Sequence, residues 1–265
     1  MLKDITLGQY FPGHSYIHKL DPRTKILGVT AYIASIFLAE AYVAYSLLIL
    51  FALFLIAISG IPPKMVARSV KPLWIIILFT IMVHILSTPG EVIYKLSFLS
   101  VTKEGLRQGI LMSLRLVLII CVASLITFTT SPISLTDGIE RLLNPFRRLG
   151  VPAHELAMMM TIALRFIPTL LEEADRIIKA QTARGADFSS GNIFKRAKSL
   201  IPILVPLFVS AFRRADELAV AMEARCYRGG EMRTRMKELK LTSQDFTAAF
   251  GLVTLIIILL VIRWG

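Results

Sequence analysis

Long apolar stretches dominate the chain, and charged residues are almost confined to the segments between them. The stretch 26–59 contains one charge, Glu40, and is too long for one span, so we expect it to turn at residues 38–42. A helix that crosses a bilayer needs about 20 mostly apolar residues. The pattern therefore predicts five membrane-spanning helices, the first of them short. Their ranges are 26–39, 42–59, 72–88, 108–130 and 244–263.

The segment between the fourth and fifth predicted spans has a different pattern. It is rich in Ala, Leu and Met, is interrupted by prolines, and begins with a short amphipathic helix over residues 134–143. Pro145, Gly150 and Pro152 then predict a break, after which two longer helices follow. The chain thus divides into residues 1–130 with four spans, residues 131–243, and residues 244–265 with the last span. We predict an all-α polytopic membrane protein with a region of amphipathic helices outside the bilayer.

Each of the two longer predicted helices carries apolar residues at steps of three and four. This spacing places them on one face, as in helices that pack against each other. Adding 41 to each position of the first series after Leu156 gives a position of the second, and the series end at Arg184 and Arg225. The first series is Leu156, Met160, Ala163, Ile167, Leu170, Ala174 and Ile177, and the second is Ile201, Leu204, Phe208, Ala211, Ala215, Leu218 and Met222.

Spacing alone leaves two interpretations of these arginines open. An arginine near a helix C-terminus can complement the helix dipole and bond the last carbonyls, with Gly185 and Gly229 as ordinary stop residues. Alternatively, the arginines dock on a partner, because a cation on a packing face is costly to bury without an acceptor. Since Ala-Arg-small occurs at both helix ends, docking is the favoured interpretation.

The composition supports the membrane class, and the charge predicts an orientation. Soluble domains carry about 25% charged residues, whereas this chain carries 18% and is 55% hydrophobic. The net charge of +12 is concentrated in residues 1–25, 60–71 and 131–241. Loops rich in Lys and Arg remain cytoplasmic, so we expect the N-terminus and residues 131–243 inside and the C-terminus outside. Nucleic-acid binding is not indicated, because it would require a basic soluble domain.

Motifs for catalysis, nucleotide binding or metal binding are missing from the sequence. It contains no G-x-x-x-x-G-K-[ST], G-x-S-x-G or H-E-x-x-H pattern, so we expect no enzymatic activity, no cofactor and no metal. His84 and Arg115 fall near the ends of predicted spans and are expected to reach the interface. A permease that binds solute itself remains an alternative, but it would need polar groups at mid-membrane, and the spans contain few.

Three segments together resemble the EcfT family, the transmembrane coupling subunits of energy-coupling factor (ECF) importers, within the wider CbiQ-like family. They are GQYFPGHSYIHKLDPRTK at 8–25, ARG at 183–185 and ARC at 224–226, and the resemblance covers nearly the whole chain. It implies a scaffold in the cell membrane with no chemistry of its own. Two ABC ATPase subunits would hydrolyse ATP, and a small substrate-binding membrane protein, the S component, would capture a vitamin or similar micronutrient.

The resemblance also implies which residues meet these partners. The ATPase-docking residues would be Ala183, Arg184, Gly185, Ala224, Arg225 and Cys226. The amphipathic helices would hold the substrate-binding protein, with candidate contacts at Met158, Met159, Met160, Phe166 and Phe208. ATP hydrolysis would move these helices and tip the substrate-binding protein to release its cargo.

Overall fold

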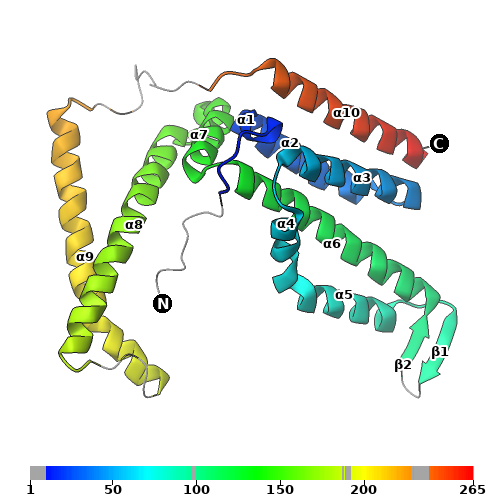
Figure 1. Ribbon diagram of the computed structural model, residues 1–265, viewed down its shortest axis with the longest axis horizontal. Helices are drawn as coiled ribbons and strands as arrows, with labels where there is room; N and C mark the ends of the chain where they lie inside the picture. The colour runs from blue at the N-terminus through cyan, green and yellow to red at the C-terminus, as the bar shows by residue number, and fades with distance from the viewer. Residues whose placement is uncertain are drawn as a thin grey trace. The chain divides into compact units, whose positions relative to one another are not determined.

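The described residues fold almost entirely into helices, together with one two-stranded hairpin (Figure 1). They group into two compact units, residues 139–237 (unit 1) and residues 8–138 with 238–265 (unit 2). The computed structural model describes residues 10–264 except 97–98, 187, 189–191, 228 and 230–238.

Unit 2 is a helical bundle that contains the apolar stretches. Helix α7 (Pro132–Leu143) begins in unit 2 and continues into unit 1. The other elements of unit 2 are α1 (Tyr16–Lys19), α2 (Pro22–Leu38), α3 (Tyr42–Ser59), α4 (Pro63–Val70), η1 (Lys71–Leu73), α5 (Trp74–Ser87), β1 (Val92–Leu96), β2 (Leu99–Thr102), α6 (Lys103–Thr129) and α10 (Ser243–Trp264).

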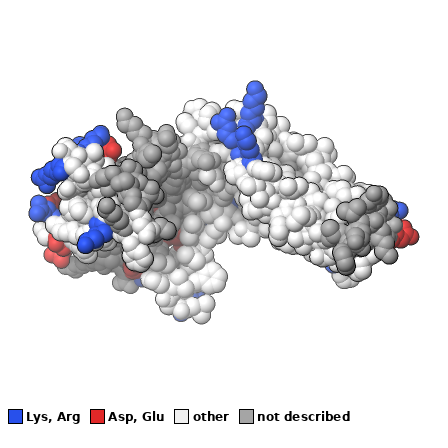
Figure 2. Space-filling model, turned by 90° about the horizontal axis from the view of Figure 1, so that it is seen from below, with Lys and Arg blue, Asp and Glu red and all other residues white. Residues whose placement is uncertain are grey.

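The core of unit 2 is formed by α2, α3, α6 and α10. Ile36, Leu48, Val122 and Leu259, one from each helix, are almost completely buried in one apolar cluster. Tyr32 lies in the same cluster, where its hydroxyl donates to the backbone carbonyl of Leu48 at 2.9 Å. A buried hydroxyl without a partner would be costly, so this bond permits a tyrosine in the core. The surface is largely uncharged on the face that Figure 2 shows. An uncharged surface suits contact with lipid.

Helix α5 packs along α6, and glycines of α6 determine how closely the two backbones approach each other. A Cβ added at Gly105 would lie 2.6 Å from the carbonyl oxygen of His84, and one at Gly109 would lie 3.3 Å from the Cα of Ile81. Small residues at helix interfaces allow backbones to approach closely within a membrane. The outer face of α5, which includes Trp74 and Phe79, is exposed.

The predicted fold class is confirmed, but two of the predicted assignments differ. Five helices in the described part of the chain are long and apolar enough to cross a membrane. One of these is Ala153–Ala183, which the sequence analysis placed outside the bilayer. The predicted span 26–39 corresponds to α2, whose 17 residues are fewer than the 20 or so that cross a bilayer. The other four match predicted spans and are Tyr42–Ser59, Pro63–Ser87, Lys103–Thr129 and Ser243–Trp264.

The connection between α5 and α6 contains a hairpin that the sequence analysis did not predict. Strands β1 and β2 pair antiparallel, with Val92 opposite Thr102 and Leu96 opposite Leu99. Thr102 ends the hairpin and begins α6, because its hydroxyl accepts a hydrogen bond from the N–H of Gly105 at 3.1 Å. Such an N-cap satisfies one of the free donors of the first turn.

Unit 1 contains the end of α7 and the two long helices. The predicted short helix and the break after it are confirmed, since η2 (Asn144–Leu149) and Gly150, with φ of 88°, follow α7. The long helices are α8 (Ala153–Ala183) and α9 (Ile193–Ala224). Prolines were expected to interrupt this region, but Pro168, Pro202 and Pro206 lie inside the two helices.

A buried lysine joins α2 to the end of α6 in unit 2. The ammonium of Lys25 donates to the carbonyl oxygens of Thr129 at 3.0 Å and His18 at 3.3 Å, and to the hydroxyl of Thr130 at 3.2 Å. These three acceptors match the three donors of the group. Burial lowers the pKa of Lys25 from 10.5 to about 8, although the nearby carboxylates of Asp245 and Asp21 oppose the shift.

This lowered pKa predicts a pH-dependent contribution to stability. Between about pH 8 and 10.5 the unfolded chain retains a proton that the folded protein has lost, so the free energy of unfolding rises with pH in this interval. Lys25→Met has no such group. The wild-type midpoint of thermal unfolding in detergent should therefore rise relative to that of Lys25→Met as the pH is raised through this interval. A difference independent of pH would contradict the assignment.

Candidate functional site

An ion pair joins α8 and α9 where the two helices cross (Figure 1). The Nη2 atom of Arg214 lies 3.0 Å from Oε2 of Glu173, and Ser210 also hydrogen-bonds this carboxylate. Glu173 and Arg214 are 41 residues apart, the same offset that relates the two apolar series. Equivalent positions of the two helices therefore meet at the crossing. The sequence analysis missed this pair, although the shared offset could have indicated it.

The second half of each predicted apolar series is mostly half-buried within unit 1, whereas the first half is exposed. Leu170 and Ile177 of α8 and Met222 of α9 are half-buried. In the first halves, by contrast, 44% of Met160 and 61% of Phe208 are exposed. The prediction of a packing face is thus confirmed near the crossing. Towards the start of each helix the same face is exposed in the part of the chain that the structure describes.

At the end of α8, backbone N–H groups bond the last carbonyls of the helix. This end is the first helix-end motif, residues 183–185. The N–H of Gly185 donates to the carbonyl of Thr182 at 2.9 Å, and the N–H of Ala186 donates to that of Gln181 at 3.0 Å. Gly185 has φ of 87°, in the left-handed region. This pair of bonds is the Schellman motif, which satisfies the free carbonyls of a helix end.

The second helix-end motif, residues 224–226, has the same geometry at the end of α9. The N–H of Cys226 donates to the carbonyl of Glu223 at 2.8 Å, and the N–H of Tyr227 donates to that of Met222 at 3.0 Å. Cys226 has φ of 56° and is the residue that stops the helix. The prediction of Gly229 as this stop residue is therefore wrong, because the chain turns three residues earlier at a non-glycine.

Both arginines leave their side chains available to a partner. Arg184 and Arg225 are exposed, and neither guanidinium has a hydrogen bond or ion pair within the part of the chain that the structure describes. The backbone bonds satisfy the last carbonyls, so the arginine side chains are not needed there. Arg184 follows Glu173 by 11 residues and Arg225 follows Arg214 by 11 residues. At 1.5 Å per residue, each arginine lies about 16 Å beyond the ion pair.

The residue after the second motif contacts the beginning of α8. The hydroxyl of Tyr227 lies 3.4 Å from Nε2 of His154 and donates to the sulfur of Met158 at 3.0 Å. On its other side His154 Nδ1 lies 3.0 Å from a carboxylate oxygen of Glu140 in α7. The first motif is followed by Ala186, which has no such side chain. The two motifs thus share a backbone geometry but differ in their immediate neighbours.

The candidate contacts for a substrate-binding protein are mostly exposed. Met159, Met160 and Phe208 lie on the surface, and Phe166 is half-buried. Met158 is also half-buried and accepts the hydroxyl of Tyr227. The flanking residues Ala183, Gly185, Ala224 and Cys226 are exposed beside the two arginines, so bulk close to each guanidinium is small.

Arg115 was predicted to lie near the end of a span, and its side chain contacts residues beside the turn between α2 and α3. It lies in the middle of α6, where Nη2 donates to the hydroxyl of Tyr45 at 3.0 Å and the guanidinium lies 5.1 Å from the ring centre of Phe37. An arginine over an aromatic ring gains cation–π attraction. Phe37 lies in the last turn of α2 and Tyr45 in the first turn of α3, so the guanidinium lies beside the turn that joins these helices.

The chain is similar in sequence to a family of transport proteins. Residues 13–236 match the family model CbiQ, described as a cobalt transport protein. Over its whole length the chain is 62% identical to the energy-coupling factor transporter transmembrane protein EcfT of Acidaminococcus fermentans, covering 99% of that protein. Proteins of the same name from Clostridium kluyveri and Bacillus subtilis are 55% and 48% identical, with coverage of 100% and 99% of this chain and 100% of each relative.

The two stop residues predict opposite effects of a reciprocal exchange. A left-handed conformation costs an L-residue roughly 1–2 kcal/mol but costs glycine nothing. Cys226→Gly should therefore slow amide hydrogen exchange in the last turn of α9 about five-fold, and Gly185→Cys should accelerate exchange in the last turn of α8 by a similar factor. Changes of the same sign in both variants would contradict this explanation.

Proposed function

The chain belongs to the CbiQ and EcfT family as a multi-pass transmembrane component of an energy-coupling factor transporter, and from this membership we propose that it couples ATPase subunits to a substrate-binding subunit. In this role it binds two ABC ATPase subunits and one S component and catalyses no reaction. The cargo is a vitamin or similar micronutrient, which the S component selects.

One observation supports this function above the others: two equivalent helix ends present unpaired arginines at equal distances from a bonded crossing. A partner made of two similar ATPase subunits offers two similar grooves, and each motif supplies one guanidinium to one groove. A guanidinium holds five donors in a fixed fork and stays charged. Its charge-assisted bonds contribute about 1.5–3 kcal/mol each. The small neighbours Ala183 and Gly185, with Ala224 and Cys226, allow entry into a narrow groove.

The crossing explains how motion would pass from one end of the helices to the other. The Glu173–Arg214 pair and the half-buried second halves of the apolar series keep α8 and α9 together at the crossing. When nucleotide binding and hydrolysis change the distance between the two ATPase subunits, the two motifs move with them. The first halves of the helices, on the other side of the crossing, then move as well.

The exposed first halves of the helices suit a membrane-embedded partner. Met159, Met160 and Phe208 are apolar and exposed, and methionine adapts its shape to different partners. We propose that these residues, with Met158 and Phe166, contact the S component. An apolar exposed face also accounts for why α8 is apolar enough to count among the candidate spans.

For the topology, we propose that the N-terminus and residues 131–243 are cytoplasmic and that the C-terminus is outside the cell membrane. The basic residues of the segments 1–25, 60–71 and 131–241 support this orientation. Functionally, residues 1–130 and 244–265 form the membrane part and residues 131–243 the coupling region. A permease that binds solute itself is not favoured, since the spans lack a group of polar residues that could form a solute site.

Reversing the charge of both motif arginines tests the proposal. Arg184→Glu combined with Arg225→Glu should abolish co-purification of the ATPase subunits while leaving membrane insertion intact, because a carboxylate cannot occupy a site built for a guanidinium. The measurement is a pull-down in mild detergent, with the subunits identified by mass.

A matched variant separates docking from the loss of positive charge. Arg165 and Arg213 are exposed, lie on the same two helices and are not part of either motif. Arg165→Glu combined with Arg213→Glu makes the same change of net charge and should retain both ATPase subunits. Retention of both subunits by the motif variant would overturn the proposal.

A further inference from the structure

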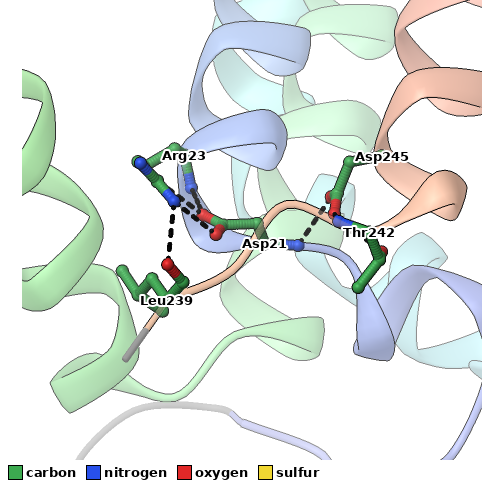
Figure 3. A network of polar contacts seen from close by, with 5 residues as sticks. All are labelled: Asp21, Arg23, Leu239, Thr242 and Asp245. Atoms are coloured by element: carbon green, nitrogen blue, oxygen red, sulfur yellow. Dashed lines mark hydrogen bonds and ion pairs between the residues drawn. The ribbon is translucent and has the colours of Figure 1, made fainter. Parts of the chain in front are cut away.

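Three segments that are distant in the sequence meet in a polar cluster at one end of unit 2. Figure 3 shows the contacts between two of them, the start of α2 and the start of α10 with the residues before it. We define the polar cluster as Asp21, Arg23, Lys25, Thr242 and Asp245. The backbone N–H of Asp21 donates to Oδ1 of Asp245 at 2.8 Å. The other oxygen of Asp245 accepts from both the N–H and the hydroxyl of Thr242 at 2.8 Å, so this carboxylate joins the start of α2 to the start of α10.

Arg23 extends the cluster to the segment that precedes α10. Its Nε and Nη2 donate to the two oxygens of Asp21 at 3.1 and 3.0 Å, in a bidentate pair. The same Nη2 atom also donates to the carbonyl of Leu239 at 3.3 Å. Only an arginine can make the fork and reach a further acceptor at the same time. The backbone around residue 239 is therefore held by a side chain from the first turn of α2.

Lys25, half a turn further along α2, binds the other end of the coupling region. Its bonds to Thr129 and Thr130 fix the residues with which α6 ends. The coupling region begins directly after Thr130, passes from unit 2 into unit 1 within α7 at residue 139, and belongs to unit 2 again from residue 238. Two neighbouring cations of one helix turn thus hold both of its connections to the bundle.

A cluster of this kind is more than helix capping requires. Asp21, Lys25 and Asp245 are each at most 7% exposed, and burying charged groups costs free energy even when they are paired. Serine or threonine would cap α2 and α10 without that cost. Buried charge of this kind is weak evidence for stability, and in some proteins its role is to fix one arrangement of the chain.

We propose that Arg23 and Lys25 are positioning residues that keep both connections of the coupling region fixed while its helices move. The inference rests on the proposed coupling function. An extended residue spans about 3.3 Å, so release of residues 239–242 would give one connection more than 10 Å of freedom. Movement at the helix-end motifs would then be absorbed by that connection instead of reaching the S component.

The test measures movement directly and needs no knowledge of the cargo. Spin labels are attached to keto amino acids introduced in place of Leu50 in α3 and Val220 in α9, both exposed, so that Cys121 and Cys226 keep their native thiols. The complex is purified with its ATPase and substrate-binding subunits. Distances between the labels are then measured by pulsed electron resonance with and without ATP, alongside ATP hydrolysis.

In the otherwise unaltered labelled complex, ATP should displace a narrow distance distribution. Arg23→Met should broaden the distribution and abolish the displacement while both ATPase subunits remain bound and hydrolyse ATP. Arg68→Met, at an exposed arginine of α4 without a partner among the described residues, should behave like the unaltered complex. If Arg23→Met does not assemble, Arg23→Lys keeps the charge but not the fork, and it should give a partial loss.

Each other outcome has a distinct meaning. If the unaltered complex shows no displacement with ATP, the coupling function itself fails. If that complex responds and both Arg23 variants respond identically, the coupling function stands and the positioning role is overturned. Loss of ATP hydrolysis in proportion to the loss of displacement would also overturn it, since the cluster would then serve only to stabilise the protein.

Discussion

A charge in apolar surroundings is tolerated only where its hydrogen-bonding atoms have partners, and this constraint organises unit 2. Asp21, Lys25 and Asp245 are buried because each satisfies backbone groups at the end of a helix as well as another side chain. The start of α2, the end of α6 and the start of α10 must therefore lie together. The apolar cores of the helices can then pack, with Ile36, Leu48 and Val122 at their centre.

In unit 1 the polar groups at the ends of the long helices are satisfied by the backbone itself. Both long helices end in a Schellman motif, in which the last carbonyls are bonded by backbone N–H groups. Among the described residues, the guanidinium groups of Arg184 and Arg225 have no hydrogen-bond or ion-pair partner. The backbone therefore closes both helix ends without the arginine side chains, and docking on a partner is our proposal for them.

The sequence predicted the helices of this protein better than their connections. Apolar runs identify α3, α5, α6 and α10, and steps of three and four identify α8 and α9, since both signals are local. The spacing of apolar residues predicts that they share one face of a helix, but it does not predict whether another element covers that face. The exposure of Met160 and Phe208 could therefore not be predicted. The hairpin of residues 92–102 and the left-handed Cys226 also went unpredicted, because each depends on backbone pairing that the residue types do not require.

The two helix ends are alike in their Ala-Arg-small sequence and in their backbone geometry. Two like surfaces related by a 41-residue offset would accept a pair of partners in either of two arrangements, and the arginines alone cannot tell one from the other. Discrimination must come from what differs, and the clearest difference is Tyr227 with its contacts to His154 and Met158, where the first end has only Ala186. Two identical partner subunits would not need a difference between the two helix ends. Under the proposed function, a pair of unlike ATPase subunits would be told apart by such a difference between the two helix ends.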